Sequence, residues 1–487
     1  MKTANVAIAM LIPFAASCAS GPRYAAPQVK MPVAFQEEPA QARDADRATL
    51  ETWWTSFQDS TLDDLIARAF AGNLDLKIAA ARVREARAVR GIAASTALPQ
   101  LDAAGAYVRT ERSDAVPPFN SSAGSVVFGA RTQNIFQAGF DAGWELDIFG
   151  GIKHDVEAAV AQAQAVEEAR RDILVTLLGD VARNYVELRG AQRQIQILDA
   201  TVVSLRDSRD LARARFDAGL GTALDTERAD GLVQATASRR PELERQVKRA
   251  MYRLAVLVGD QPAALASLLE APHTMPSRPP AVPPTLPSEL LSRRPDLRRT
   301  ERQVAAATAR IGVARADLFP RFSITGSFGR RSQDASDLGS TTSQFWSIVP
   351  GVRLPILSGG RLRASIEVSE ARQEIALQEY EKAILGALEE VENALVGRDR
   401  EERRVDALKA SAEANRRALE LATDRYTSGL ESFLSVLDAQ RALYAAEDGV
   451  AESETSATVS LIALYKALGG GWTLQAPEPA AARGDRQ

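Results

Sequence analysis

Apolar and polar residues alternate without a break along the stretch Phe136-Gln137-Ala138-Gly139-Phe140-Asp141-Ala142-Gly143-Trp144-Glu145-Leu146-Asp147-Ile148. Because successive side chains of a β-strand point to opposite faces, one face is apolar and the other polar. Strands of globular domains usually have about 5–6 residues. A strand that crosses a membrane needs about 9–11 tilted residues, with an apolar outer face and a polar lumen. The stretch therefore predicts a transmembrane strand at about 134–148.

Three further stretches predict strands, at about 99–112, 320–331 and 344–357. The alternation is clear from Phe322 to Phe328 and weakest in the first stretch. In the last stretch, alternate residues are apolar and lie close to Trp346, an aromatic residue suited to a membrane interface. The sequence thus predicts four strands in one chain.

Four strands cannot form a membrane barrel alone, because the open edges of a sheet are not viable in lipid. The smallest transmembrane barrels have about eight strands, and side chains fill a barrel of that size. If the protein conducts, at least three chains must therefore share one barrel.

The two halves of the chain repeat each other at a spacing of about 210–220 residues, the mark of a tandem duplication. The corresponding motifs, in the same order in both halves, are Asn73–Leu76 with Arg294–Leu297, Leu98-Pro99 with Phe319-Pro320, Ile148–Gly151 with Ile356–Gly360, and Arg215–Leu220 with Arg425–Leu430. The predicted repeats are 61–258 and 288–470, joined by a proline-rich equatorial linker at 259–287.

Each repeat contains one very long predicted helix, at 153–218 and 361–427. The first shows the 4-3-4-3 apolar spacing of a coiled coil, with one local discontinuity. At 1.5 Å per residue, each helix would be about 100 Å long, too long for the core of a compact domain. Shorter helices at about 74–97, 222–258, 296–317 and 431–468 would pack end to end along the long ones. The prolines between Pro262 and Pro287 predict extended, non-helical chain there, as part of an equatorial belt.

The N-terminus has the pattern of a secretory signal. Lys2 precedes a short apolar segment, and the small residues Ala15-Ala16-Ser17 precede the single cysteine, Cys18. We predict a signal peptide at 1–17 and acylation of Cys18, followed by a lipid-anchored segment at 18–60 that also joins the belt. The alternative is an ordinary signal with a chance cysteine. Residues 471–487 are predicted to be a C-terminal tail.

The composition argues against several classes of function. The 487 residues carry a formal net charge of −4, with no basic surplus for nucleic-acid binding. The only histidines, His154 and His273, are far apart, and neither has the spacing of a metal site. The sequence has no glycine-rich phosphate loop and no positioned Ser–His pair. We therefore expect no enzyme, no cofactor and no metal.

Several motifs resemble those of TolC/OprM-type outer-membrane factors of tripartite efflux systems, in particular the NodT-like lipoprotein branch. The resemblance covers nearly all of the mature chain. The motifs that carry it are Cys18–Tyr24, Trp53-Trp54 with Phe57, Asp59 and Leu62, Leu318-Phe319-Pro320, Leu437–Arg441 and Leu464–Trp472.

The resemblance implies a mainly α-helical homotrimer, with a twelve-stranded transmembrane β-barrel in the outer membrane and an α-helical tunnel in the periplasm. It implies a passive channel for substrates, lipid-anchored through palmitate and other acyl chains at Cys18. It also implies two partners, a periplasmic adaptor (membrane fusion protein) and an inner-membrane efflux pump. We expect the RND type of pump, although pump type and substrate stay open.

The resemblance also implies a gate at the inner end of the tunnel, formed by Tyr426, Asp438 and Arg441. The residues alone favour a different interpretation of Asp438 and Arg441, an exposed i,i+3 pair worth about 0.2–0.5 kcal/mol, and the motif match reverses that preference. The adaptor-contacting tips would be Ala218, Gly219, Leu220, Gly221 and Thr222 in the first repeat, and Ser428, Gly429, Leu430, Glu431 and Ser432 in the second.

The alternative hypothesis for the function is a structural coiled-coil lipoprotein of the cell envelope without channel activity. It accounts for the anchor and the helices. It does not account for four long amphipathic strands.

Overall fold

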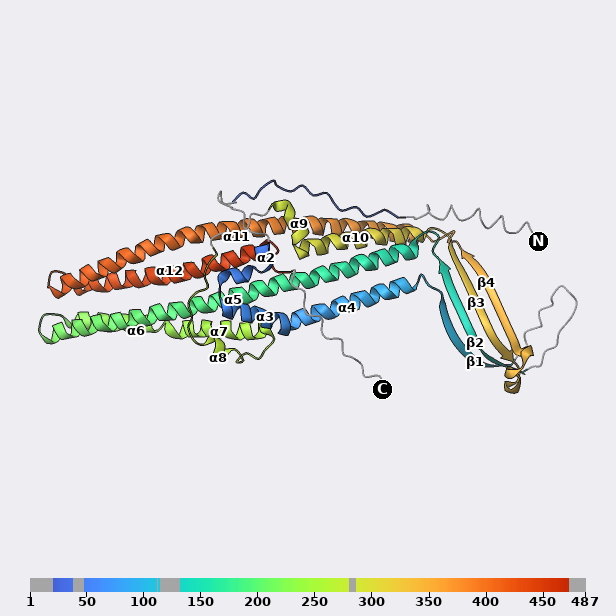
Figure 1. The fold of residues 1–487 in the computed structure, drawn as a ribbon, viewed down its shortest axis with the longest axis horizontal. Helices are drawn as coiled ribbons and strands as arrows, with labels where there is room; N and C mark the ends of the chain where they lie inside the picture. Colours follow the sequence, from blue (N-terminus) through green and yellow to red (C-terminus); the bar gives the residue numbers. More distant parts are fainter. Residues whose placement is uncertain (1–20, 38–47, 112, 114–131, 280–285, 473–487) are drawn as a thin grey trace. The chain divides into compact units, whose positions relative to one another are not determined.

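A computed structural model describes residues 21–37, 48–111, 113, 132–279 and 286–472 (Figure 1). The predicted signal peptide, Cys18 and most of the predicted tail lie outside these residues. The chain divides into two compact units. Unit 1 consists of residues 1–27, 84–164 and 301–378, and unit 2 of residues 28–83, 165–300 and 379–487.

Unit 1 contains one antiparallel sheet in the order β1-β2-β3-β4 (Figure 1). The strands are β1 Gln100–Glu111, β2 Thr132–Leu146, β3 Arg321–Ser332 and β4 Gln344–Arg353. The prediction of four strands in one chain is confirmed, and the structure adds that neighbouring strands are antiparallel. Two 3₁₀ turns, η3 Ala335–Gly339 and η4 Thr341–Ser343, connect β3 to β4.

Two strands end earlier than the alternation suggests. β2 ends at Leu146, because the next residue, Asp147, turns its carboxylate to the backbone N–H of Lys153 in the first turn of the following helix, at 2.7 Å. β4 ends at Arg353, because Arg353 is paired with Arg321, the first residue of its partner strand β3. In both places apolar residues continue the alternation beyond the last ladder bond.

The cross-strand register assigns the two faces of the sheet. Directly paired residues share a face, and Phe140 is paired with both Ala103 and Phe328, which in turn is paired with Trp346. Eight large apolar residues of this face are exposed in the single chain: Leu101, Tyr107, Phe140, Trp144, Phe328, Trp346, Ile348 and Val352. An exposed apolar face of this extent requires a non-aqueous neighbour.

Two helices of 67 residues each dominate the chain, α5 Gly151–Asp217 and α11 Arg361–Thr427. Their presence confirms the predicted long helices. The residues of the 4-3-4-3 series before the discontinuity are buried along α5: Leu174, Leu178, Val181, Tyr185 and Leu188. Of the series predicted after it, Ala191, Leu198, Val202 and Leu205 are buried and Ile195 is half-buried.

Five shorter helices accompany the long ones: α4 Leu74–Ser95, α6 Ala223–Ala237, α7 Arg240–Val258, α10 Pro295–Ala316 and α12 Phe433–Ala467. The prediction of one helix over 222–258 is wrong, because the chain breaks between α6 and α7. Pro241 lies in the first turn of α7, a position that tolerates proline. In the interior of one longer helix, its missing N–H and its ring would disrupt the hydrogen bonds to the preceding turn. The equivalent helix of the second repeat, α12, has no proline and runs unbroken.

The belt region of unit 2 is built around aromatic residues. The Trp53 ring stacks on Tyr465 at 5.2 Å between centroids, and Trp54 and Phe57 are buried beside them. The short elements here are α2 Ala48–Glu51, η1 Trp53–Phe57, α3 Ser60–Gly72, α8 Ala266–Leu269, η2 Pro287–Glu289 and α9 Leu290–Arg293. The expectation that no part of Pro262–Pro287 is helical is therefore wrong at α8. That turn precedes the dense prolines, and residues 280–285 lie outside the described part.

None of the helices in the described part of the chain combines the length and the apolar character needed to cross a membrane.

Candidate functional site: the helical tips

Both long helices end in the same turn. Gly219 and Gly429 have φ angles of +72° and +73°, in the left-handed region that glycine adopts without strain. In the first turn, the N–H of Leu220 donates to the carbonyl of Arg215 and the N–H of Gly219 to that of Phe216. The second turn repeats this pattern, and both are Schellman caps. The predicted tips are therefore tight reversals set by these two glycines.

The following helices are capped differently. Thr222 caps α6 through a capping box, in which its hydroxyl accepts from the N–H of Asp225 and the Asp225 carboxylate accepts from the N–H of Thr222. In the second tip the side chain of Ser432 makes no capping bond. The Glu431 carboxylate instead accepts from the Ser435 hydroxyl at 2.9 Å and from the N–H of Ser432 at 3.4 Å.

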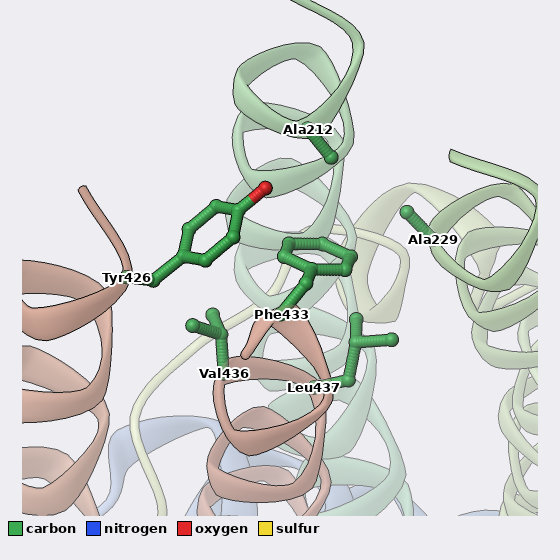
Figure 2. Packing of buried hydrophobic residues seen from close by; sticks show 6 residues of the cluster. All are labelled: Ala212, Ala229, Tyr426, Phe433, Val436 and Leu437. Atoms are coloured by element: carbon green, nitrogen blue, oxygen red, sulfur yellow. The ribbon is translucent and has the colours of Figure 1, made fainter. Parts of the chain in front are cut away.

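A buried cluster next to the tips joins four helices. Tyr426 of α11 packs against Phe433 of α12, with 5.1 Å between ring centroids (Figure 2). Ala212 of α5 and Ala229 of α6 face these rings, and Val436 and Leu437 complete the cluster. Of the predicted gate residues, Tyr426 is thus part of the packing between the two helical hairpins, at 5% exposure.

Arg215, in the last turn of α5, contacts the end of α11 in two ways. Its Nη1 donates to the Thr427 carbonyl at 2.8 Å, and its guanidinium lies over the Tyr426 ring at 4.7 Å. The carbonyls of a last helical turn carry partial negative charge, which favours a cation there. Arg215 therefore ties the first hairpin to the second.

The hydroxyl of Tyr426 is buried and has no hydrogen-bond partner within the described residues. Burial raises the pKa of Tyr426, the positive charge of Arg215 opposes this shift, and Asp225 adds to it. The hydroxyl is therefore neutral over the physiological range.

The other two predicted gate residues lie apart from this cluster. Asp438 and Arg441 are paired with each other on α12 at 3.3 Å, and their side chains are 61% and 54% exposed. In the single chain they form the exposed i,i+3 pair that the residues alone suggest.

The tips also expose apolar side chains to solvent. Leu220 and Leu430 stand at equivalent places after the two glycines and are 69% and 68% exposed. Phe216, Leu224 and Leu434 are exposed nearby. Grouped apolar residues at the end of a helical hairpin are typical of a protein-binding surface.

Arg215 is the contact that the sequence did not single out. Nε of its repeat counterpart, Arg425, lies 3.7 Å from Oε2 of Glu431 in the same hairpin, and the Arg425 side chain is 58% exposed. Arg215 and Arg425 occupy equivalent positions in the two repeats. Only the packing of the hairpins decides which of the two arginines contacts the other hairpin. No grouping of potential metal ligands occurs within the described residues.

Comparison with known proteins agrees with this geometry. The family of outer membrane efflux proteins matches the chain over residues 65–260 and 286–470, one match for each repeat.

Individual relatives match nearly end to end. The chain is 36% identical to the outer membrane protein OprJ of Pseudomonas aeruginosa over 458 residues, 94% of this chain and 93% of that protein. It is 30% identical to nodulation protein T of Rhizobium leguminosarum, over 93% of this chain and 95% of that protein. The solved structure of the outer-membrane channel OprN matches with a TM-score of 0.88 and 34% identity, over 94% of this chain and 100% of that chain. This chain therefore belongs to the family of outer membrane efflux proteins.

Proposed function

We propose that this outer-membrane efflux protein works as a homotrimeric duct that passively conducts substrates from a periplasmic tunnel to the exterior. The observation that carries the proposal is the open sheet of unit 1. Its order leaves one edge of β1 and one edge of β4 without a partner strand among the described residues. In lipid such edges must be paired, and β4 of one copy with β1 of the next satisfies both.

The number of copies follows from the size of the pore. Two copies would give eight strands, a barrel that side chains fill, whereas three give twelve strands and room for an aqueous lumen. The apolar face with Phe140 and Trp346 would meet lipid, and the opposite face, with Asp102 paired to Asp141, would line the lumen.

The gate of this duct would lie at the helical tips. Three copies would bring three Asp438–Arg441 pairs around one axis, where contacts between neighbouring chains add to the weak pair seen within one chain. Tyr426 and Arg215 would hold the two hairpins of each chain together in the closed state. Modest contacts repeated around a ring can keep a channel closed until a docking partner shifts the equilibrium.

The partner at the tips would be a periplasmic adaptor, itself coupled to an inner-membrane pump of the RND type. The exposed Leu220 and Leu430 support this, because six such leucines in a trimer would form an apolar rim. Capping by Thr222 and Glu431 would hold that rim in a fixed shape.

The chain would be held in the outer membrane by acylation of Cys18 as well as by its strands. The signal-like sequence that precedes this cysteine supports the anchor. A single acyl chain gives only marginal membrane binding, so the anchor would assist insertion rather than replace the barrel.

Planar-bilayer recording of the purified protein separates the duct from a structural coiled-coil lipoprotein. We expect a trimer by native mass spectrometry and discrete conductance steps in the bilayer. A monomeric protein would contradict the duct, and so would the absence of any step in both the unchanged protein and the variant Asp438→Ala with Arg441→Ala. A form with its strand hairpins removed is the control for leaks caused by detergent.

A further inference from the structure

The first described residues of the chain lie in a notch of unit 1. A Cβ atom built on Gly21 would stand 2.6 Å from the Cα of Gly312 in α10 and 2.7 Å from Nε2 of His154 in α5. A Cβ on Gly312 would stand 2.5 Å from the imidazole ring of His154. These spacings leave no room for a single methyl group. Both glycines are therefore required for the contact.

The next residues continue this contact. The Tyr24 hydroxyl donates to the carboxylate of Glu301, and its ring packs against a small apolar cluster made by Ala161, Ala305 and Ala306. The Arg302 guanidinium lies over the Tyr24 ring at 5.5 Å. One hydrogen bond, one cation–π contact and apolar packing thus act on a single side chain three residues after Gly21.

His154 forms the floor of the notch and is 5% exposed. Its Nδ1 lies 2.8 Å from the Glu157 carboxylate, which fixes the ring, and its Nε2 faces Gly21. The ring acts as a rigid wall, because a buried imidazole held by a carboxylate has little freedom to move. This packing accounts for the burial of His154.

We propose that the notch, which lies between α5 and α10, is an intramolecular docking site for the segment Gly21–Tyr24. We also propose that this docking fixes where the lipid anchor leaves the protein. The second part rests on the acylation of Cys18 in the proposed function. Cys18 precedes Gly21 by three residues, so an extended chain reaches at most about 11 Å. The anchor is thus confined to the region around the first turn of α5.

Within unit 1, the first turn of α5 lies close to the apolar face of the sheet. α5 begins five residues after the end of β2, and the apolar face of the sheet begins at its last residue, Leu146, paired with Phe322. Docking would therefore hold the acyl chains at the edge of the apolar face. An undocked N-terminal segment would leave the position of the acyl chains unrestricted.

Limited trypsin digestion of the purified full-length protein in detergent tests the docking, with mass spectrometry of the fragment that ends at Arg23. Proteases need a segment that can leave the surface, so a docked segment is cut slowly. We expect Gly312→Leu to speed this cut at least tenfold. Gly91→Leu is the matched control, because Gly91 is a helical glycine of unit 1 with nothing within 4 Å of its built Cβ.

A second variant keeps the test independent of the folding of α10. Gly21→Leu changes only the docked segment, and we expect the same acceleration, whereas Tyr24→Phe should give a smaller one. If both leucine variants are cut at the rate of the unchanged protein, the docking proposal is wrong. The released fragment also carries the mass of any lipid on Cys18. A fragment without lipid would remove the anchor from the proposed function and leave the docking result intact.

Discussion

Nη1 of Arg215 lies 2.8 Å from the carbonyl oxygen of Thr427, so one side chain of the first repeat completes the last turn of the long helix of the second. The counterpart of Arg215 in the second repeat, Arg425, does not return this contact and pairs with Glu431 instead. A duplicated chain has therefore given two equivalent arginines different roles. This asymmetry makes the proposed role of Arg215 in keeping the tips closed testable.

Arg215→Gln should weaken the tie between the hairpins. A hydrogen bond from a charged group and a partly buried cation–π contact are together worth on the order of 2 kcal/mol in each chain. We expect more frequent or longer openings in planar-bilayer recordings at constant voltage.

Arg425→Gln is the control for that experiment, because it removes the same charge from the same place in the other repeat. Exposed ion pairs contribute about 0–1 kcal/mol, so the openings should stay close to those of the unchanged protein. Equal effects of the two variants would show that charge at the tips matters and that the crossing contact does not.

The ring of Tyr426, rather than its hydroxyl, should hold together the buried cluster next to the tips. Tyr426→Phe keeps the packing on Phe433 and the cation–π contact and removes a buried hydroxyl that has no partner within the described residues. We expect unchanged conductance and an unchanged or higher unfolding temperature. Tyr426→Ala should open the channel and lower the unfolding temperature, because truncation of a buried aromatic residue typically costs about 3–5 kcal/mol. A Phe variant as leaky as the Ala variant would assign the gate contact to the hydroxyl.

The two tips should respond differently to loss of their capping residues. Thr222→Ala removes the hydroxyl that accepts from the N–H of Asp225, keeps the bond from its own N–H to the Asp225 carboxylate, and should cost about 1 kcal/mol of local stability. Ser432→Ala should cost much less, because the Ser432 side chain makes no capping bond. Hydrogen–deuterium exchange of the first turns of α6 and α12 reports each effect separately. The assignment of the cap to Thr222 would be wrong if Ser432→Ala accelerated exchange in α12 more than Thr222→Ala accelerated it in α6.

Asp172 should make stability depend on pH. Burial raises the pKa of Asp172 above its usual value, and Asp296 adds to the shift, while Arg299, Arg294 and Lys466 oppose it. The folded state thus binds a proton more readily than the unfolded state, so this group stabilises the protein progressively as the pH falls from its raised pKa towards 3.8. Asp172→Asn should raise the unfolding temperature at pH 7.5, with a difference that disappears near pH 4. A difference that grows on acidification would contradict the sign of the shift.

The elements set by local periodicity could be predicted from the sequence, and the ends of these elements only in part. Alternation located β2, yet it continues through Asp147, whose carboxylate caps the next helix instead of extending the strand. Apolar spacing located the helical region after Thr222 but missed the break at Pro241, since a proline fits equally in a first turn. Whether Arg215 or Arg425 crosses between the hairpins depends on tertiary packing, which no local pattern records. The docking of Gly21 against Gly312 joins residues far apart in sequence and has no local signal.

The most direct test of the gated duct is single-channel conductance of the purified trimer, compared between the unchanged protein and the double variant Asp438→Ala with Arg441→Ala. The account predicts small or rare conductance steps for the unchanged protein and larger or longer ones for the double variant, because three weakened pairs no longer hold the tips closed. Absence of any step in both proteins, as verified trimers, would contradict the account.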